Sequence, residues 1–183
     1  MRILLTKLLL VLIIVCVFPA ISQSAESEWN EAGVRIAIPA NKKHEYFHQY
    51  DAFAVYGLPW DWHNSSGWGV KPKADFSLGV LSGGGETSII TSAGPGLILY
   101  KQGIGLAADV GINADILGRR HFGKQDFGSM VLFGAYMGLN YRFSNNIKIG
   151  YRLQHLSNGH IFYPKGTPNP GLDTHLFGIS YAF

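Results

Sequence analysis

A histidine and a serine stand two residues apart in the stretch YRLQHLSNGH, residues 151–160. Side chains two apart on a strand share one face, about 6.6 Å apart along the chain, and can lean together into a hydrogen bond. A serine hydroxyl activated by a histidine is the nucleophile of many acyl-transfer enzymes. The spacing alone fits two polar residues at a fraying strand end equally well, so the orientation of the strand has to decide.

A carboxylate is available on the next predicted strand. Asp173 opens that strand, which returns beside the strand of His155. Together they supply the parts of an acyl-transfer triad, with Ser157 as nucleophile, His155 as base and Asp173 as the acid that orients the imidazole. Asn158 and the backbone N–H groups near Gly159 would supply an oxyanion hole. The alternative interpretation is a polar rim at a membrane interface.

The elements that must position these residues follow from an alternation of apolar and polar residues with a period of two. In residues 104–116 the even positions are all apolar, and residues 131–143 alternate in the same way. No stretch after residue 25 keeps a helical period over three turns. The pattern predicts an all-β protein with strands at 28–38, 46–57, 70–82, 87–100, 104–117, 128–143, 147–157 and 173–183.

Eight is the smallest even number of strands in an outer-membrane barrel. A lipocalin-type barrel is apolar inside, whereas a membrane barrel carries its apolar side chains outside. Small residues opposite the apolar face suit a narrow lumen. The final segment HLFGISYAF ends in Phe183, which is similar to the C-terminal signature of bacterial outer-membrane barrels. The sequence therefore predicts an eight-stranded antiparallel transmembrane β-barrel.

Residues 1–25 have the pattern of a signal peptide. Arg2 and Lys7 precede or flank the start of an apolar run, and small, polar residues follow it. The run is too short for a comfortable transmembrane helix, so we expect cleavage after Ser22 or Ala25.

The remaining chain, 26–183, is predicted to be a single domain. Its formal net charge is small, because the whole chain carries only +3 and two of the cations lie in the leader. Cys16 is the sole cysteine and also lies in the leader, so the mature chain would have no disulfide and no thiolate metal site.

The strand pattern orients the candidate triad. In residues 147–157 the odd positions are mostly apolar, so this face is predicted to meet lipid, and His155 and Ser157 lie on it. Asp173 shares the corresponding face of the last strand. Polar groups that face lipid are energetically unfavourable and tend to be functional.

Loop lengths orient the barrel if both termini are periplasmic. The short turns are at 101–103 and 144–146, and the longer connections at 39–45, 118–127 and 158–172 would then be external. This places the candidate triad at the external end. The stretch 58–69 does not fit, because it is a long periplasmic turn.

HLSNGHI, followed by PNPGLD and a last aromatic strand, resembles the lipid A 3-O-deacylase (PagL) family, and YGLPWDW with a later Trp-Gly is also similar. The resemblance implies an eight-stranded outer-membrane barrel with a His-x-Ser-Asn motif on its seventh strand. It implies a serine esterase that hydrolyses the ester-linked 3-hydroxyacyl chain at position 3 of lipid A, with no metal and no cofactor.

Carried over residue by residue, the resemblance makes His155 and Ser157 catalytic, aligns Asn158 with the asparagine of the motif and places the acid at Asp173. Three differences from the family pattern bear mainly on the assignment of the acid. Asp stands where the best-known form has Glu, Gly159 where Ala is usual, and the loop between Asn158 and Asp173 is longer.

The expected partners are lipopolysaccharide and outer-membrane lipids, with no nucleic acid, and a homodimer is left open. Basic residues of the external loops are either ordinary solvated charge or a site for lipid phosphates. They are Lys42, Lys43, Arg119, Arg120, Lys124 and Lys165.

Three other functions remain open from the residues alone. They are a non-catalytic small barrel (structural or adhesin-like), a phospholipase or acyltransferase on the same barrel, and a periplasmic lipocalin-like carrier. His44 to His48 match H-E-x-x-H, but a strand would hold the two histidines about 13 Å apart, too far to share zinc. No metal site is therefore expected.

Overall fold

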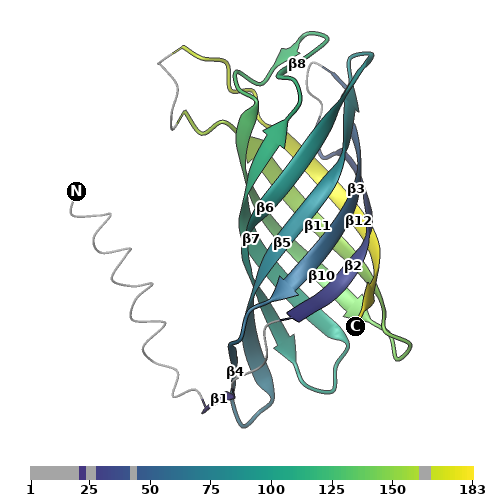
Figure 1. Ribbon diagram of the computed structural model, residues 1–183, viewed down its shortest axis with the longest axis vertical. Helices are drawn as coiled ribbons and strands as arrows, with labels where there is room; N and C mark the ends of the chain where they lie inside the picture. Colours follow the sequence, from purple (N-terminus) through teal and green to yellow (C-terminus); the bar gives the residue numbers. More distant parts are fainter. Residues whose placement is uncertain (1–20, 24–27, 42–44, 161–165) are drawn as a thin grey trace, which may run out of the picture.

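The computed structural model describes residues 21–23, 28–41, 45–160 and 166–183, and these form a closed antiparallel barrel (Figure 1). Each long strand pairs with its neighbours in chain order, and β12 pairs with β2 to close the ring. This confirms the predicted eight-stranded antiparallel barrel. Its strands are β2 (Glu28–Pro39), β3 (His48–Gly57), β5 (Trp68–Gly83), β6 (Glu86–Lys101), β7 (Leu106–Leu117), β10 (Val131–Arg142), β11 (Ile147–Ser157) and β12 (Leu172–Ala182).

Four shorter strands decorate the two ends of the barrel. β4 (Asp61–His63) pairs with the start of β5 and with β1 (Ile21–Gln23), so the stretch 58–69 is not a plain turn. β8 (His121–Phe122) and β9 (Gln125–Asp126) form a small hairpin at the opposite end. β1 falls inside the predicted signal peptide, most of which lies outside the described residues, so the leader and its cleavage site stay predictions.

The outer wall of the barrel is apolar. A soluble barrel would expose mostly polar side chains, whereas a continuous apolar belt suits the hydrocarbon layer of a membrane. The belt therefore contradicts the soluble carrier alternative. Its most exposed members include Val34, Ile36, Leu78, Ile89, Val110, Ile112, Met137, Leu139, Ile149 and Ile179. Over the part of the chain that the structure describes, no helix is long and apolar enough to cross a membrane.

The lumen is filled by paired charges. Lys73 Nζ lies 2.6 Å from Asp109 Oδ2 and 2.8 Å from Asp75 Oδ2. Arg152 contacts the same two carboxylates at 2.9 and 3.2 Å, and the Tyr136 hydroxyl donates to Asp75 at 2.6 Å. We call these five residues the luminal cluster.

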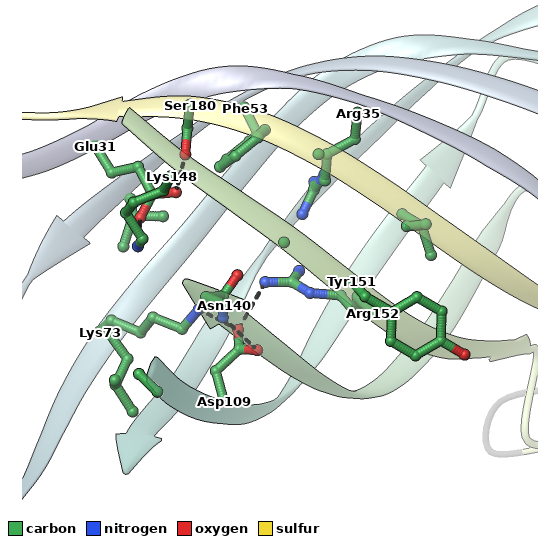
Figure 2. Close-up of a pocket in the computed structure, with 16 residues that line it drawn as sticks. Glu31, Arg35, Phe53, Lys73, Asp109, Asn140, Lys148, Tyr151, Arg152 and Ser180 are labelled. Carbon is green, nitrogen blue, oxygen red and sulfur yellow. Dashed lines mark hydrogen bonds and ion pairs between the residues drawn. The ribbon is translucent and has the colours of Figure 1, made fainter. Parts of the chain in front are cut away.

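The space left beside the luminal cluster is a cavity of about 40 Å³, which is room for water only. Figure 2 shows Lys73 and Arg152 both reaching Asp109, while Arg35 points toward them from β2. The barrel interior is therefore not an open channel at this level.

Nearer the end with the long connections, the interior is closed by an apolar plug. Phe122 of β8 and Phe127 after β9 pack on Phe47, with ring centroids 5.6 Å apart in both pairs. The plug also contains Leu156 and Leu172, which are next to His155 and Asp173 in the chain and face inward. A rigid packed core thus lies directly behind the candidate triad. Its members are Phe47, Leu81, Ile90, Leu117, Phe122, Phe127, Leu132, Leu156 and Leu172.

The two ends of the barrel differ as predicted. The short turns after β6 and β10 lie at the end that carries the C-terminus (Figure 1). The connections after β2, β7 and β11 lie at the opposite end, where β8 and β9 also sit. The strand ends that hold His155, Ser157 and Asp173 are at this second end.

Candidate active site on the outer wall

Pairing of β11 with β12 sets His155 directly opposite Asp173. His155 is 54% exposed and Asp173 29% exposed, and Ser157 is half-buried on the same outward face. The residue between the histidine and the serine, Leu156, is buried in the plug. Period-two geometry therefore puts all three polar side chains on the outer wall, at the end of the apolar belt.

The histidine and the acid are in direct contact. His155 Nδ1 lies 2.5 Å from Asp173 Oδ1. An ionised carboxylate accepts the Nδ1–H of the ring, which leaves Nε2 as the nitrogen that can accept a proton. This is the arrangement that a histidine needs to act as a general base toward a hydroxyl.

Ser157 lies two residues further along the same face of β11. Between Ser157 and His155, both of which the structure describes, there is no hydrogen bond. Hydrogen bonds between nucleophile and base are often long or misaligned without substrate and tighten only in the complex. The structure thus places the three predicted residues side by side but joins only two of them.

Asp173 is also held from its other side, by a residue that the sequence reasoning missed. Asn41 Nδ2 donates to Asp173 Oδ2, and the Ala40 N–H donates to the Asp173 carbonyl at 2.8 Å. The two carboxylate oxygens therefore have different contacts, Oδ1 with His155 of β11 and Oδ2 with Asn41 just beyond the end of β2. Asn41 stands in an unremarkable NKK segment that is 132 residues away in sequence, so no local signal marks it.

Asn158, one of the two predicted oxyanion-hole residues, is fully buried. Its Nδ2 donates to the carbonyls of Phe127 and Pro168 at 2.9 and 2.7 Å. Its backbone N–H donates to Asn169 Oδ1 at 3.0 Å, another contact that the sequence reasoning missed. These bonds anchor the start of the loop between β11 and β12, so an oxyanion role for Asn158 would require one of them to be released.

Comparison with known proteins bears on the same region. The family model described as lipid A 3-O-deacylase (PagL) matches residues 48–182, which is most of the chain and includes β11 and β12. The chain belongs to the lipid A 3-O-deacylase (PagL) family. The resemblance seen in HLSNGHI and PNPGLD is thereby confirmed.

Two relatives extend the comparison. Lipid A deacylase PagL of Bordetella bronchiseptica is 33% identical over 75 residues, which cover 41% of this chain and 40% of that protein. The matched stretch thus spans well under half of the length of this curated relative. The crystal structure of the outer membrane enzyme PagL superimposes with a TM-score of 0.68 at 20% identity, over 82% of this chain and 99% of that one. At that identity the likeness establishes the shared barrel fold.

In this PagL-family barrel the β8–β9 hairpin is bonded to Gly171, whose backbone lies close to the ring of His155. Gly171 has φ +62°, and a Cβ at that position would come within 3.0 Å of His155 Cε1. The carbonyl of Gly171 accepts a hydrogen bond from Gln125 Nε2 of β9 at 3.1 Å. Glycine is needed here both for the left-handed backbone and for the close approach of the ring.

Gly159, the second predicted oxyanion-hole residue, is exposed and has φ +61°. It begins the turn that carries the chain away from the end of β11. The left-handed conformation of a glycine changes the direction in which the following backbone N–H groups point. A role of Gly159 in oxyanion binding stays a prediction.

A second polar pair lies on the outer wall of β11 and β12, further from the strand ends. The Tyr151 hydroxyl is 2.8 Å from His175 Nδ1, and the two rings stack with centroids 5.9 Å apart. His175 lies opposite Leu153 in the strand register. This pair satisfies its own hydrogen bond and does not contact the His155–Asp173 pair.

The described part of the H-E-x-x-H stretch, residues 45–48, does not form a helix. Glu45 accepts a hydrogen bond from the Lys124 N–H at 2.8 Å, and His48 is the first residue of β3, while His44 lies outside the described residues. In the ranges that the structure covers, no three His, Cys, Asp or Glu side chains are grouped to hold a metal ion.

Two of the basic loop residues are already paired. Arg119 contacts Glu86 at 2.9 Å, and Arg120 contacts Asp126 at 3.6 Å. Lys42, Lys43 and Lys165 lie outside the described residues. A role of these loops in binding lipid phosphates therefore stays a prediction.

Proposed function

We propose that this chain is an outer-membrane serine esterase that hydrolyses the ester-linked 3-hydroxyacyl chain at position 3 of lipid A. Ser157 is the nucleophile, His155 the general base and Asp173 the acid that orients the imidazole. The observation that carries this proposal is the direct contact of His155 with Asp173 on the outer wall. Ser157 lies two residues after His155, on the same face of β11. Membership in the PagL family supports the substrate class.

The chemistry proceeds in two balanced steps. Ser157 Oγ attacks the ester carbonyl while His155 Nε2 accepts the hydroxyl proton, and Asp173 stabilises the imidazolium that forms. The C–O bond to the glucosamine breaks, and the proton on Nε2 passes to the leaving sugar oxygen. Water then attacks the acyl-enzyme, giving its proton to His155, and the free 3-hydroxy acid leaves as Ser157 Oγ regains a proton.

The negative charge of the tetrahedral intermediate needs hydrogen-bond donors close to Ser157. We keep Asn158 and the backbone N–H groups near Gly159 for this role. Asn158 would contribute after it releases one of its contacts to the loop, such as the 3.0 Å bond from its N–H to Asn169. Binding of substrate beside the loop would release this hydrogen bond.

The outer position of the site fits a substrate that is itself part of the membrane. The lumen behind the site is closed by the apolar plug and by the luminal cluster, so substrate cannot arrive through the barrel. Lipopolysaccharide fills the outer leaflet, and its acyl esters lie near the headgroup level. With the long connections on the external side, lateral diffusion in that leaflet brings an ester bond directly to Ser157.

The test uses the full chain, folded in detergent micelles and incubated with purified lipopolysaccharide, followed by mass spectrometry of the lipid A. We expect loss of one 3-hydroxyacyl chain with the wild type and none with Ser157→Ala. Ser77→Ala is the matched control, because Ser77 is also half-buried but lies on the luminal face of β5. An unchanged lipid A spectrum with the wild type, given a folded barrel, would refute the proposal.

A parallel incubation with phosphatidylethanolamine separates the deacylase from a phospholipase on the same barrel. Release of fatty acid from phospholipid at a rate equal to or above that from lipid A would overturn the substrate assignment. It would leave the serine esterase mechanism in place.

A further inference from the structure

We infer that Asn41 is a positioning residue for the acid–base pair: its side-chain amide fixes the Asp173 carboxylate so that the other oxygen faces His155. The inference rests on the proposed function and names a residue from the β2–β3 connection, far from the His-x-Ser-Asn motif in sequence. It is carried by two contacts between this connection and Asp173, one from a side chain and one from the backbone.

The strand order explains how Asn41 reaches the site. β12 lies between β11 and β2, and Thr174 pairs with Pro39, the last residue of β2. The chain continues past Pro39 alongside the start of β12, where the Ala40 N–H donates to the Asp173 carbonyl at 2.8 Å. The next residue, Asn41, then meets the Asp173 side chain from the side opposite His155.

Four polar residues thus form a row across the outer wall, in the order Asn41, Asp173, His155, Ser157. We call this the outer-wall row. Asn41 Nδ2 donates to Oδ2 of the carboxylate, and His155 Nδ1 contacts Oδ1. A carboxylate held on both oxygens cannot rotate about its Cβ–Cγ bond without breaking one of these contacts.

Two physical reasons make this restraint useful here. Asp173 is partly exposed, so the apolar plug does not lock its side chain by packing. It is also one methylene shorter than glutamate, so a small rotation would take its oxygen out of reach of the imidazole. A neutral amide restrains the carboxylate but leaves its negative charge intact, and that charge is what stabilises the imidazolium.

The competing explanation is that Asn41 only ties the end of β2 to β12. Loss of a tie of that kind would lower the stability of the barrel and would leave kcat per folded molecule unchanged. Positioning acts only through the carboxylate, so it must vanish when the carboxylate is removed. A double-mutant cycle between Asn41 and Asp173 separates the two explanations.

The experiment measures steady-state deacylation of lipopolysaccharide by wild type, Asn41→Ala, Asp173→Ala and the double variant, together with thermal unfolding of each. We expect Asn41→Ala to lower kcat about tenfold with little change in KM, because misplaced catalytic groups slow the chemical step more than binding. In the Asp173→Ala background the same change should alter kcat less than about twofold. Asn64→Ala, in the turn at the opposite end of the barrel, is the matched control and should keep wild-type kcat.

Two results would overturn the inference: wild-type kcat for Asn41→Ala, or an equal loss from Asn41→Ala in both backgrounds. Failure of the proposed function itself would look different, because then the wild type would release no acyl chain or Ser157→Ala would release as much as the wild type. If Asn41→Ala unfolds at a lower temperature, Asn41→Ser and Asn41→Gln, which keep a donor, serve as second variants. Recovery of kcat by either variant supports positioning, and recovery of the unfolding temperature with kcat still low contradicts it.

Discussion

The luminal cluster and the outer-wall row share one strand, β11, yet they lie on opposite sides of the barrel wall. Arg152 of β11 faces inward and touches Asp75 and Asp109, and each of these carboxylates is also bound by Lys73. His155, three residues later, faces outward and touches a single carboxylate, whose other oxygen is held by a neutral amide. The residues of the luminal cluster are buried and pair with one another. The outer-wall row is partly exposed, and its last member is the Ser157 hydroxyl.

Even and odd positions of β11 point to opposite sides of the barrel wall, so one strand carries both a stabilising cluster and a candidate reactive group. Inside the barrel, charges are kept in place because removing one partner leaves another charge buried without compensation. Outside, a polar row at the end of an apolar belt is unfavourable for stability and brings no packing in return. We therefore expect changes in the luminal cluster to act on stability and changes in the outer-wall row to act on the reaction rate.

The largest expected effect is on the reaction rate. His155→Ala removes the base and should lower kcat by about a thousandfold or more, as loss of a triad member does. Because His155 is exposed and its contact with Asp173 lies on the outer wall, the temperature of thermal unfolding should stay within a few degrees of wild type. A variant that loses both activity and its unfolding transition would show that the outer-wall row also contributes to stability.

The next effect is on stability. Arg152→Leu leaves Asp75 and Asp109 with one cation between them, so we expect the free energy of unfolding to fall by about 3 kcal/mol. Deacylation per folded molecule should stay near wild type. Arg142→Leu, an exposed arginine that contacts Asn146, is the control and should change stability by less than about 0.5 kcal/mol. Equal destabilisation by both substitutions would show that the luminal cluster contributes no more to stability than an exposed arginine.

A smaller effect is expected from Gly171→Ala, because the added methyl group would approach the outer-wall row from behind. The added methyl would lie 3.0 Å from the His155 ring, in a backbone conformation that costs an alanine about 1 kcal/mol. We predict a loss of roughly tenfold in kcat. Gly166→Ala is the matched control, since Gly166 also has positive φ but nothing within 4 Å of its added methyl. Similar losses from both glycines would point to loop strain and away from His155.

The smallest effect should come from Tyr151→Phe. This change keeps the ring stacked near His175 and removes only the hydroxyl that is 2.8 Å from the His175 ring. The pair lies on the outer wall but does not contact the outer-wall row, so kcat for lipid A should change by less than about twofold. A tenfold loss, measured by the same mass-spectrometric assay, would extend the functional surface along β11.

The eight long strands and their inward and outward faces could be predicted from the amino-acid sequence, and with them the outward position of His155 and Ser157. The short strands β4, β8 and β9 could not. Alternation with a period of two is a local property, so the apolar and polar faces of residues 147–157 can be predicted without the rest of the chain. The motif HLSNGHI was local in the same sense, and it carried the family.

Contacts between residues of different strands followed only from the tertiary structure. The contact of Asn41 with Asp173 depends on the register between the first and last strands of the barrel, and that register is set only when the ring closes. The close approach of Gly171 to His155, the burial of Asn158 and the pairing of β4 with β5 likewise depend on segments that meet through space. No periodicity within one segment encodes such contacts, because they depend on how the other strands and loops pack.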